Sequence, residues 1–273
     1  MNCNILSETN RHVRDANIQF FEKDHKYCIA TDPDSKYTSV TTWVHSHFPK
    51  FDADTIILKM MSSKSWKPGH KYWGKDADQI KKQWSDNGSS ASGAGTDLHY
   101  DIECFMNNDK LPPKYTHNDL LQASTIHRNT SIEWQYFLQF VTDTPKLRPY
   151  RTEWCVYNED LKLSGSIDMI YENPDGTLSI YDWKRSKEIT PVNRFNKYAI
   201  NPIIAHFPDS NYWHYALQLN TYRAIIESKY DKKVKDLFLV RLYPDNEVKT
   251  YDLIKMPILD EELSHLLLQD NQF

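Results

Sequence analysis

Two aspartates and a lysine within residues 164–186, SGSIDMIYENPDGTLSIYDWKRS, have types and spacing suited to metal-dependent chemistry. The Asn-Pro-Asp-Gly stretch at 173–176 predicts a hairpin with a three-residue loop and a bulge at its glycine. The register set by that turn places Asp168 directly opposite Asp182, with their Cβ atoms roughly 5 Å apart. Lys184 lies on the same face because side chains alternate along a strand.

Opposed carboxylates repel each other, so this arrangement needs a compensating charge. One hypothesis is a solvated face on which Lys184 forms an ion pair. A second is a divalent cation between the carboxylates, which turns the repulsion into ligation. A third is an acid and base pair acting on a sugar, but such carboxylates lie roughly 5–9.5 Å apart across a substrate. A hairpin pair beside a lysine suits a metal better.

A helix is expected to bring two further polar side chains to this region. The stretch NGSSASGAG at 87–95 predicts a break, after which Thr96 would cap a helix that runs to about Asn107. His99 and Glu103 are four residues apart and therefore share one face of that helix. A histidine beside an apolar stripe is usually structural, so its assignment depends on its neighbours.

Two other elements carry polar residues that are candidates for the same site. Gln218 and Tyr222 are four apart on a helix expected at about 212–229. Glu153 alternates with Trp154 on a strand expected at 150–157. Glu153 is either directed toward the carboxylates or an ordinary exposed glutamate, and the Gln218 face is either functional or simply solvated.

The order of expected elements indicates a mixed α/β fold. A helix, three antiparallel strands, a second helix and a further strand form the core, with helices packed on a sheet. The remaining elements are a hairpin at 18–31, a strand running into a helix within 36–48, helices over 52–87 interrupted at 68–69, a helix over 117–141, strands at 162–171, 178–184, 236–243 and 247–254, and a short C-terminal helix.

Five motifs in order resemble the RecB-like branch of the PD-(D/E)XK nucleases. They are G-x3-H (Gly95 to His99), E (Glu153), G-x2-D (Gly165 to Asp168), D-x-K (Asp182-Trp183-Lys184) and Q-x3-Y (Gln218 to Tyr222). The N-terminal SVTTWV also resembles the opening segment of mitochondrial genome maintenance exonuclease and of stand-alone phage and large-virus nucleases. The resemblance implies a restriction-endonuclease-like core at 91–273, and a mostly helical, substrate-guiding region at 1–90.

The resemblance also implies a metal centre. Asp168 and Asp182 would be carboxylate ligands of Mg²⁺ or Mn²⁺, and His99 and the backbone carbonyl of Trp183 would complete the shell. An imidazole ligand makes Mn²⁺ more plausible than in a site built of oxygen alone. Lys184 would orient or deprotonate the attacking water, or stabilise charge at the phosphate.

The other motif residues would support this centre. Gln218 and Tyr222 would brace Lys184 or contact the DNA backbone, and Glu103 and Glu153 would support the ligands from behind. Glu153 is also a candidate catalytic residue. The expected activity is a metal-dependent DNA nuclease, an exonuclease on single-stranded ends or flaps in DNA replication, repair or recombination. The alternatives are a structure-specific endonuclease, a catalytically silent nucleic-acid-binding module, or an interaction protein with surface charges.

A nucleic acid partner requires a local basic patch, because the net charge is −4. Seven lysines lie between Lys59 and Lys82, with aromatic residues interleaved. Lysines can hold phosphates and aromatic rings can stack on bases, although a solvated helical surface has the same composition. The candidate nucleic-acid-binding residues are Lys64, Lys67, Lys71, Tyr72, Trp73, Lys75, Lys81 and Lys82.

Composition predicts a soluble intracellular protein with no membrane partner. No apolar run approaches the roughly 20 residues of a membrane span, and the N-terminus has no signal-peptide core. Four scattered cysteines without a CxxC pair are expected to be reduced thiols. The iron–sulfur cluster of some relatives is not expected, because no cysteine follows Cys155. Proteins of replication or recombination are expected as further partners.

Overall fold

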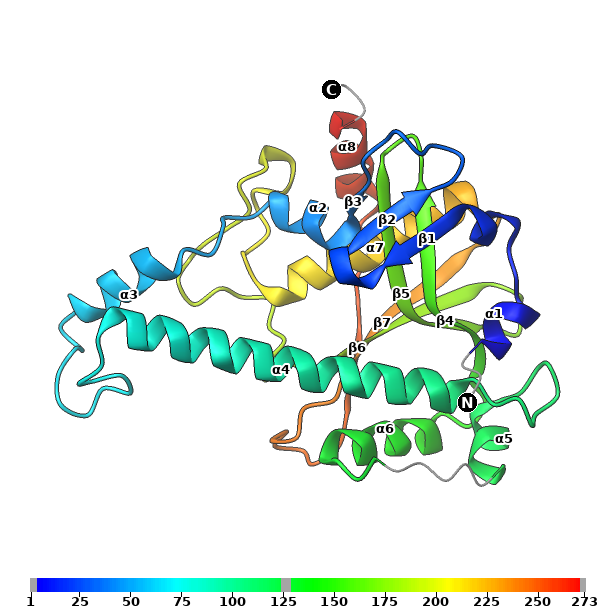
Figure 1. Ribbon diagram of the computed structural model, residues 1–273, viewed down its shortest axis with the longest axis horizontal. Coiled ribbons are helices and arrows are strands. Elements are labelled where there is room, and N and C mark those ends of the chain that lie inside the picture. Colours follow the sequence, from blue (N-terminus) through cyan, green and yellow to red (C-terminus); the bar gives the residue numbers. More distant parts are fainter. Residues whose placement is uncertain (1–3, 124–128, 271–273) are drawn as a thin grey trace. The chain divides into compact units, whose positions relative to one another are not determined.

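The computed structural model describes residues 4–123 and 129–270. It contains two compact units, one formed by Met1–Pro49 with Leu98–Phe273 and the other by Lys50–Asp97. These limits differ from the expected division at residue 90. The helices, shown with the strands in Figure 1, are α1 Ile5–Thr9, η1 Val13–Asn17, η2 Glu22–Asp24, α2 Val40–Ser46, α3 Ala53–Met61, α4 Ala77–Met106, α5 His117–Gln122, α6 Ile132–Asp143, η3 Pro202–Ile204, α7 Asn211–Lys229 and α8 Asp260–Asp270.

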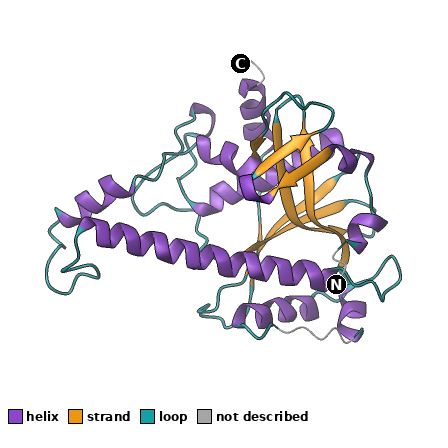
Figure 2. Cartoon of the chain, in the orientation of Figure 1, coloured by secondary structure: helices purple, strands orange, loops and turns teal. Residues whose placement is uncertain are grey.

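A six-stranded sheet forms the centre of the first unit (Figure 2). Strands β4, β5 and β6 are antiparallel, β7 runs parallel to β6, β8 is antiparallel to β7, and the short β3 is parallel to β5. The sheet is therefore mixed, as the sequence predicts. The strands are β1 Ile18–Phe21, β2 Lys26–Ile29, β3 Thr38–Ser39, β4 Arg148–Asn158, β5 Leu163–Glu172, β6 Leu178–Lys184, β7 Val234–Arg241 and β8 Asp252–Lys255.

The hairpin between β5 and β6 has the predicted register. Its loop closes with a 2.8 Å hydrogen bond from Asn173 N to Thr177 O, and Gly176 has a φ of 81°. Pairing runs from Glu172 opposite Leu178 to Met169 opposite Tyr181. The next residues along this register are the two aspartates of the predicted site.

Helices cover both faces of the sheet. On one face α2, α7 and α8 pack against strand residues that include Ile180 and Leu237. On the other face α5, α6 and the last turns of α4 pack against Met169, Tyr181 and Val240. The predicted helix at 212–229 is confirmed. The two apolar clusters pack the sheet between helical layers, and this packing supports the strands that carry the site.

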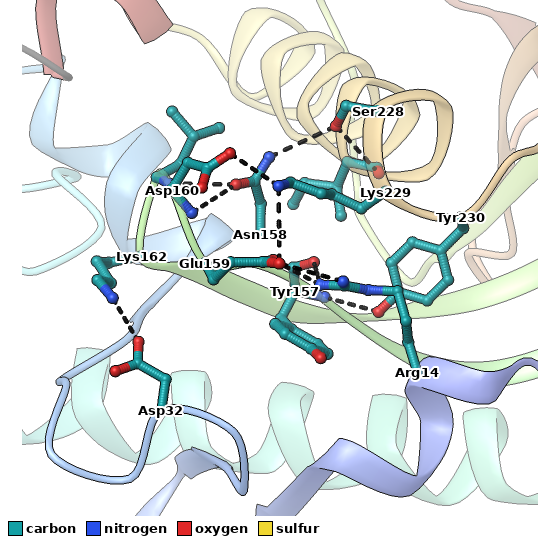
Figure 3. Close-up of polar contacts among 12 residues, drawn as sticks. Arg14, Asp32, Tyr157, Asn158, Glu159, Asp160, Lys162, Ser228, Lys229 and Tyr230 are labelled. Atoms are coloured by element: carbon teal, nitrogen blue, oxygen red, sulfur yellow. Dashed lines mark hydrogen bonds and ion pairs between the residues drawn. The ribbon is translucent and has the colours of Figure 1, made fainter.

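Side chains of the N-terminal segment contact the turn that connects β4 to β5 (Figure 3). The Arg14 guanidinium lies 4.0 Å from the centre of the Tyr157 ring and 2.6 Å from a carboxylate oxygen of Glu159. Lys162 pairs with Asp32 on the same side. These contacts, together with the pairing of β3 to β5, explain why residues 1–49 belong to the same compact unit as the sheet.

The predicted break at 87–95 is wrong. Helix α4 continues through this stretch, and Thr96 lies inside the helix instead of capping it. Each glycine costs a helix about 1 kcal/mol, but the helix contains no proline, so no backbone donor is missing from its interior. The Thr96 hydroxyl donates to Ser92 O at 3.1 Å, a bond that a helical serine or threonine commonly makes.

The prediction of a single helix over 117–141 is also wrong, because two separate helices lie in this range. The structure has α5 up to Gln122 and α6 from Ile132, and residues 124–128 of the predicted helix lie outside the described residues. Ser131 begins the second helix, because its side chain accepts a hydrogen bond from Trp134 N at 3.1 Å. The polar Asn-Thr-Ser run before Ile132 is the signal for this new start.

Two observations bear on the predictions about compartment. Within residues 4–123 and 129–270, no helix has the length and apolar character needed to cross a membrane. Cys28 and Cys155 carry free thiols, but Cys104 is disulfide-bonded. The prediction of reduced thiols is therefore wrong for Cys104.

A buried histidine predicts acid sensitivity of the fold. His117 is fully buried, with Nδ1 2.9 Å from the Thr144 hydroxyl and Nε2 2.9 Å from the Tyr171 hydroxyl. Burial lowers the pKa of His117 to about 3. In the unfolded chain His117 takes up a proton as the pH falls through about 6.5, whereas in the folded chain it stays neutral at that pH. Stability should fall as pH drops below about 6.5, by up to about 1.4 kcal/mol per pH unit from this residue.

The measurement is the free energy of unfolding by urea at pH 7 and pH 5, for wild type and His117→Gln. The variant should be less stable at pH 7, and its deficit should shrink by about 2 kcal/mol at pH 5 because glutamine does not titrate. An unchanged deficit at the two pH values would contradict a strongly lowered pKa of His117.

Candidate active site

Three antiparallel strands place three carboxylates in a row. Thr152 pairs with Met169 and Trp154 with Ile167, so Glu153 on β4 lies across from Asp168 on β5. The β5–β6 pairing ends at Met169 opposite Tyr181, and the next residue of β6, Asp182, is close enough for the charge of Asp168 to raise its pKa. The central aspartate is thus flanked by one acidic residue on each neighbouring strand.

The strands are irregular at this row. Ile167 and Met169 pack in different apolar clusters, on opposite faces, although a regular strand would place them on the same face. Glu153 has a φ of 41°, in the left-handed region that non-glycine residues rarely adopt. Irregularities of this kind re-aim side chains and are frequent beside active sites.

His99 of α4 faces two of the carboxylates. Its Nδ1 lies 3.6 Å from Asp168 Oδ2 and 4.0 Å from Glu153 Oε1. One ligand atom from each of these three residues lies within 4.8 Å of the others. Asp182 is outside this set, so the acidic residue that completes the cluster is Glu153.

The peptide unit of Trp183 holds two members of the cluster. Its N–H donates to Asp168 Oδ2 at 3.0 Å, and its carbonyl oxygen lies 3.0 Å from His99 Nε2. A proton on Nε2 would make the second contact a hydrogen bond and leave the Nδ1 lone pair directed toward the carboxylates. The carbonyl predicted to complete the site is therefore next to the imidazole.

Asp182 instead pairs with Lys184. The distance from Lys184 Nζ to Asp182 Oδ2 is 2.6 Å, and Asp182 is 1% exposed. Burial alone would lower the pKa of Lys184, but Asp182 and Asp168 outweigh it and hold that pKa above its ordinary value. The predicted placement of Lys184 on the face of Asp182 is confirmed, and the Tyr215 ring lies 4.6 Å from Nζ.

Burial and mutual repulsion disfavour the ionised form of the carboxylates in this row. Burial, and then the charge of Asp168, raise the pKa of both Glu153 and Asp182. Burial also raises the pKa of Glu103, whose charge acts on Glu153 in the same direction. The Ser166 hydroxyl opposes this by donating to Glu153 Oε2 at 2.9 Å. Acidic groups that lie close together and are buried from solvent favour the binding of a cation between them.

The Q-x3-Y motif packs beneath the row. Gln218 bonds the Tyr222 side chain and, with Tyr215, lines a cavity of about 150 Å³. The buried Tyr222 ring lies directly over Gly165, where an added Cβ would come within 2.7 Å of ring atoms. The glycine of G-x2-D is explained by this close approach, and Tyr215 is the helix residue that touches Lys184.

Gly165→Ala is therefore expected to destabilise the fold by about 1–3 kcal/mol, because a buried ring must move. The backbone of Gly165 has no positive φ, so the cost is steric alone. Urea unfolding of Gly165→Ala, with Gly176→Ala in the open hairpin turn as the comparison for backbone strain, checks this. If the double variant Gly165→Ala with Tyr222→Leu loses less stability than the two single changes predict together, the cost of Gly165→Ala comes from the Tyr222 ring. Wild-type stability of Gly165→Ala would contradict the close packing.

Three residues near the row were missed from the sequence. Ser166 bonds Glu153, Tyr215 lies against Lys184, and the Tyr27 side chain of the β1–β2 hairpin reaches the backbone of Ser166. Ser166 follows the motif glycine and Tyr215 precedes the motif glutamine, so both lie at motif edges. Nothing in the sequence near Tyr27 indicates that this residue lies near the site, because its position depends on contacts between segments that are far apart in the chain.

The donor set fits a divalent cation. One imidazole nitrogen and carboxylate oxygens of Asp168 and Glu153 lie within 4.8 Å of one another. The carbonyl oxygen of Trp183 lies on the other side of the same imidazole, 3.0 Å from Nε2. Oxygen ligands suit Mg²⁺, and a nitrogen ligand extends the preference toward Mn²⁺. The accumulated negative charge of the row supports the same conclusion.

The second unit carries the candidate nucleic-acid-binding residues. Trp73 is 46% exposed, Tyr72 is half-buried, and Lys75 is half-buried with Nζ bonded to Gln83 at 2.6 Å. Lys81 pairs with Asp54 at 2.8 Å. The remaining candidates are exposed lysines, namely Lys64, Lys67, Lys71 and Lys82.

Comparison with known proteins defines the class. Residues 73–271 match the family model of the PD-(D/E)XK nuclease superfamily. The chain belongs to this superfamily, whose members hydrolyse phosphodiester bonds of nucleic acids and generally use divalent metals such as Mg²⁺. Its place in the RecB-like branch stays a prediction.

One solved structure to which the chain is similar is a protein from Eubacterium rectale, provisionally named an exonuclease. The two chains are 15% identical with a TM-score of 0.34, over 93% of this chain and 83% of that chain. No curated protein matches the sequence.

Proposed function

We propose that this protein is a metal-dependent DNA nuclease, an exonuclease acting on single-stranded ends or flaps. The observation that supports it most strongly is the convergence of His99, Glu153 and Asp168 within 4.8 Å, beside the Asp182–Lys184 pair. A superfamily that cleaves phosphodiester bonds supplies the reaction class.

His99, Asp168 and Glu153 would hold a divalent cation, with the Trp183 carbonyl beside them and Asp182 contributing charge from the next strand. A cation bound there supplies an activated water and relieves negative charge at the phosphate. Lys184, 2.6 Å from Asp182, presents its ammonium beside the row and would orient the phosphate or the water.

The remaining residues hold this arrangement. Ser166 fixes the Glu153 carboxylate, the Trp183 N–H fixes Asp168, and Tyr215 lies over the Lys184 ammonium. Glu103 adds negative charge behind Glu153, and Tyr222 with Gln218 supports the sheet face beneath. The nitrogen ligand favours activity with Mn²⁺ as well as Mg²⁺.

The basic and aromatic residues between Lys59 and Lys82 would guide the DNA strand, as part of a substrate-guiding region within residues 1–90. Exposed lysines beside the half-exposed Trp73 support this role. Removal of single-stranded ends is the chemistry that replication, repair and recombination of DNA require, and we place the protein in that setting.

Cleavage of end-labelled single-stranded, duplex and covalently closed circular DNA, each with Mg²⁺, Mn²⁺ or EDTA, tests the proposal. Metal-dependent loss of linear single strands with circles left intact is the expected result. Nicking of circles would make the protein an endonuclease. Binding without cleavage of any substrate would make it a silent nucleic-acid-binding module.

A further inference from the structure

The segment between β6 and α7 is a long connection that starts beside Lys184 and ends in the helix that carries Tyr215. It is drawn yellow-green to yellow in Figure 1. Both ends lie at the site, because Asn211 Nδ2 donates to Ser186 Oγ at 3.4 Å and the Tyr215 ring lies against Lys184. Residues 185–210 are therefore anchored at the reaction centre.

Hydrogen bonds organise the tip of this connection around Asn193. Its side-chain oxygen accepts from Phe195 N at 2.8 Å and from Lys197 N at 3.3 Å, and its amide donates to Asp209 O. Asp209 N donates back to Lys197 O at 2.9 Å. These hydrogen bonds connect the two sides of the tip.

This defined tip holds an aromatic ring in solvent. Phe195 is 84% exposed, the largest exposed fraction among the large apolar side chains that the structure describes. Tyr198, close by in the chain, is 44% exposed. Both rings are therefore accessible to a partner that offers an apolar face.

Two cations flank the ring in the chain. Arg194 and Lys197 are both exposed. Arg194 forms an ion pair with Glu188, with 2.9 Å between a guanidinium nitrogen and Oε1. A partner that offers a flat apolar face beside negative charge complements this arrangement. A single-stranded nucleic acid combines unstacked bases with phosphates, whereas a duplex keeps its base faces covered.

We propose that Phe195 is a stacking platform for a base of a single-stranded substrate, with Arg194 and Lys197 contacting the adjacent phosphates. This inference rests on the proposed function and adds a strand-binding residue outside the metal cluster. The connection that carries the platform begins after Lys184 and leads into the helix of Tyr215, so it is continuous with the residues of the site.

The test is the affinity for a fluorescent single-stranded oligonucleotide, measured by anisotropy in Ca²⁺, with cleavage by the same preparation measured in Mg²⁺ and Mn²⁺. Phe195→Ala should weaken binding roughly 5- to 150-fold, the range seen when one stacking ring is removed. Phe195→Trp should retain affinity. Val192→Ala, a 60% exposed apolar residue of the same connection, should bind as wild type.

Two further readouts identify the contact. On an abasic oligonucleotide, Phe195→Ala should bind as wild type does, because no base is present to stack. Lys197→Ala should reduce the slope of log affinity against log salt by about 0.7, and Phe195→Ala should leave that slope unchanged. An unchanged melting temperature of Phe195→Ala will show that the fold is intact.

If wild type binds and cleaves while Phe195→Ala binds equally well, the platform is wrong and the nuclease assignment stands. An equal loss of affinity on the abasic strand would also overturn it. A change of oligomeric state without a change of affinity would assign the ring to a protein contact instead. Absence of both binding and cleavage in wild type would overturn the platform together with the proposed function.

Discussion

Asp168→Asn is expected to reduce metal-dependent cleavage by at least about 100-fold while leaving the melting temperature unchanged or higher. Asp168 is the centre of the acidic row and a member of the three-residue cluster. Loss of one group that stabilises charge in a transition state costs about 10²–10³ in rate. The asparagine oxygen can still accept the Trp183 N–H, and removing one of three neighbouring charges relieves repulsion.

Initial rates on a single-stranded substrate and thermal unfolding of the same preparations check this expectation. Asp236→Asn is the matched control, because Asp236 is a strand aspartate of β7 that pairs with Lys255 at 2.6 Å, outside the acidic row. That variant should cleave as wild type. A strong loss of stability in Asp168→Asn, or cleavage at the wild-type rate, would argue against Asp168 as a metal ligand.

Lys184→Ala is expected to lower cleavage by about 10²–10³ and also to destabilise the fold by about 3 kcal/mol. The activity loss follows because, in the proposed mechanism, the Lys184 ammonium orients the phosphate or the attacking water. The stability loss follows because Asp182, 1% exposed, would keep a buried charge without its partner at 2.6 Å.

A double variant separates the two effects. Asp182→Asn with Lys184→Met removes both charges and keeps the side-chain volumes, so it should recover stability and still fail to cleave. Lys255→Ala, which breaks the more exposed ion pair with Asp236 between β8 and β7, should leave cleavage unchanged. Cleavage by Lys184→Ala at the wild-type rate would remove Lys184 from the mechanism.

The register of the site was predictable because one turn determines it. The Pro-Asp-Gly loop sets the pairing of β5 and β6 from Glu172 opposite Leu178 to Met169 opposite Tyr181, and Asp168 and Asp182 are the next residues along it. Helix α7 was predictable for a similar reason, since its apolar stripe recurs at helical spacing.

The errors arise where tertiary structure outweighs local preference. Three glycines among serines and alanines at 87–95 favour a break, yet the helix continues, with Leu98, Ile102 and Phe105 buried in its later turns. The left-handed φ of Glu153, which accompanies its place opposite Asp168, has no sequence signal. Tyr27 reaches the site only because a hairpin distant in the chain is fastened to the sheet.

The most direct test of the central claim is calorimetric titration of Mn²⁺ into wild type and Asp168→Asn in the absence of nucleic acid. The account predicts that wild type binds the cation at the His99, Glu153 and Asp168 cluster, and that Asp168→Asn loses this binding while remaining folded. Equal binding of Mn²⁺ by both proteins would show that the acidic row is not the metal centre, and it would contradict the mechanism proposed for this nuclease.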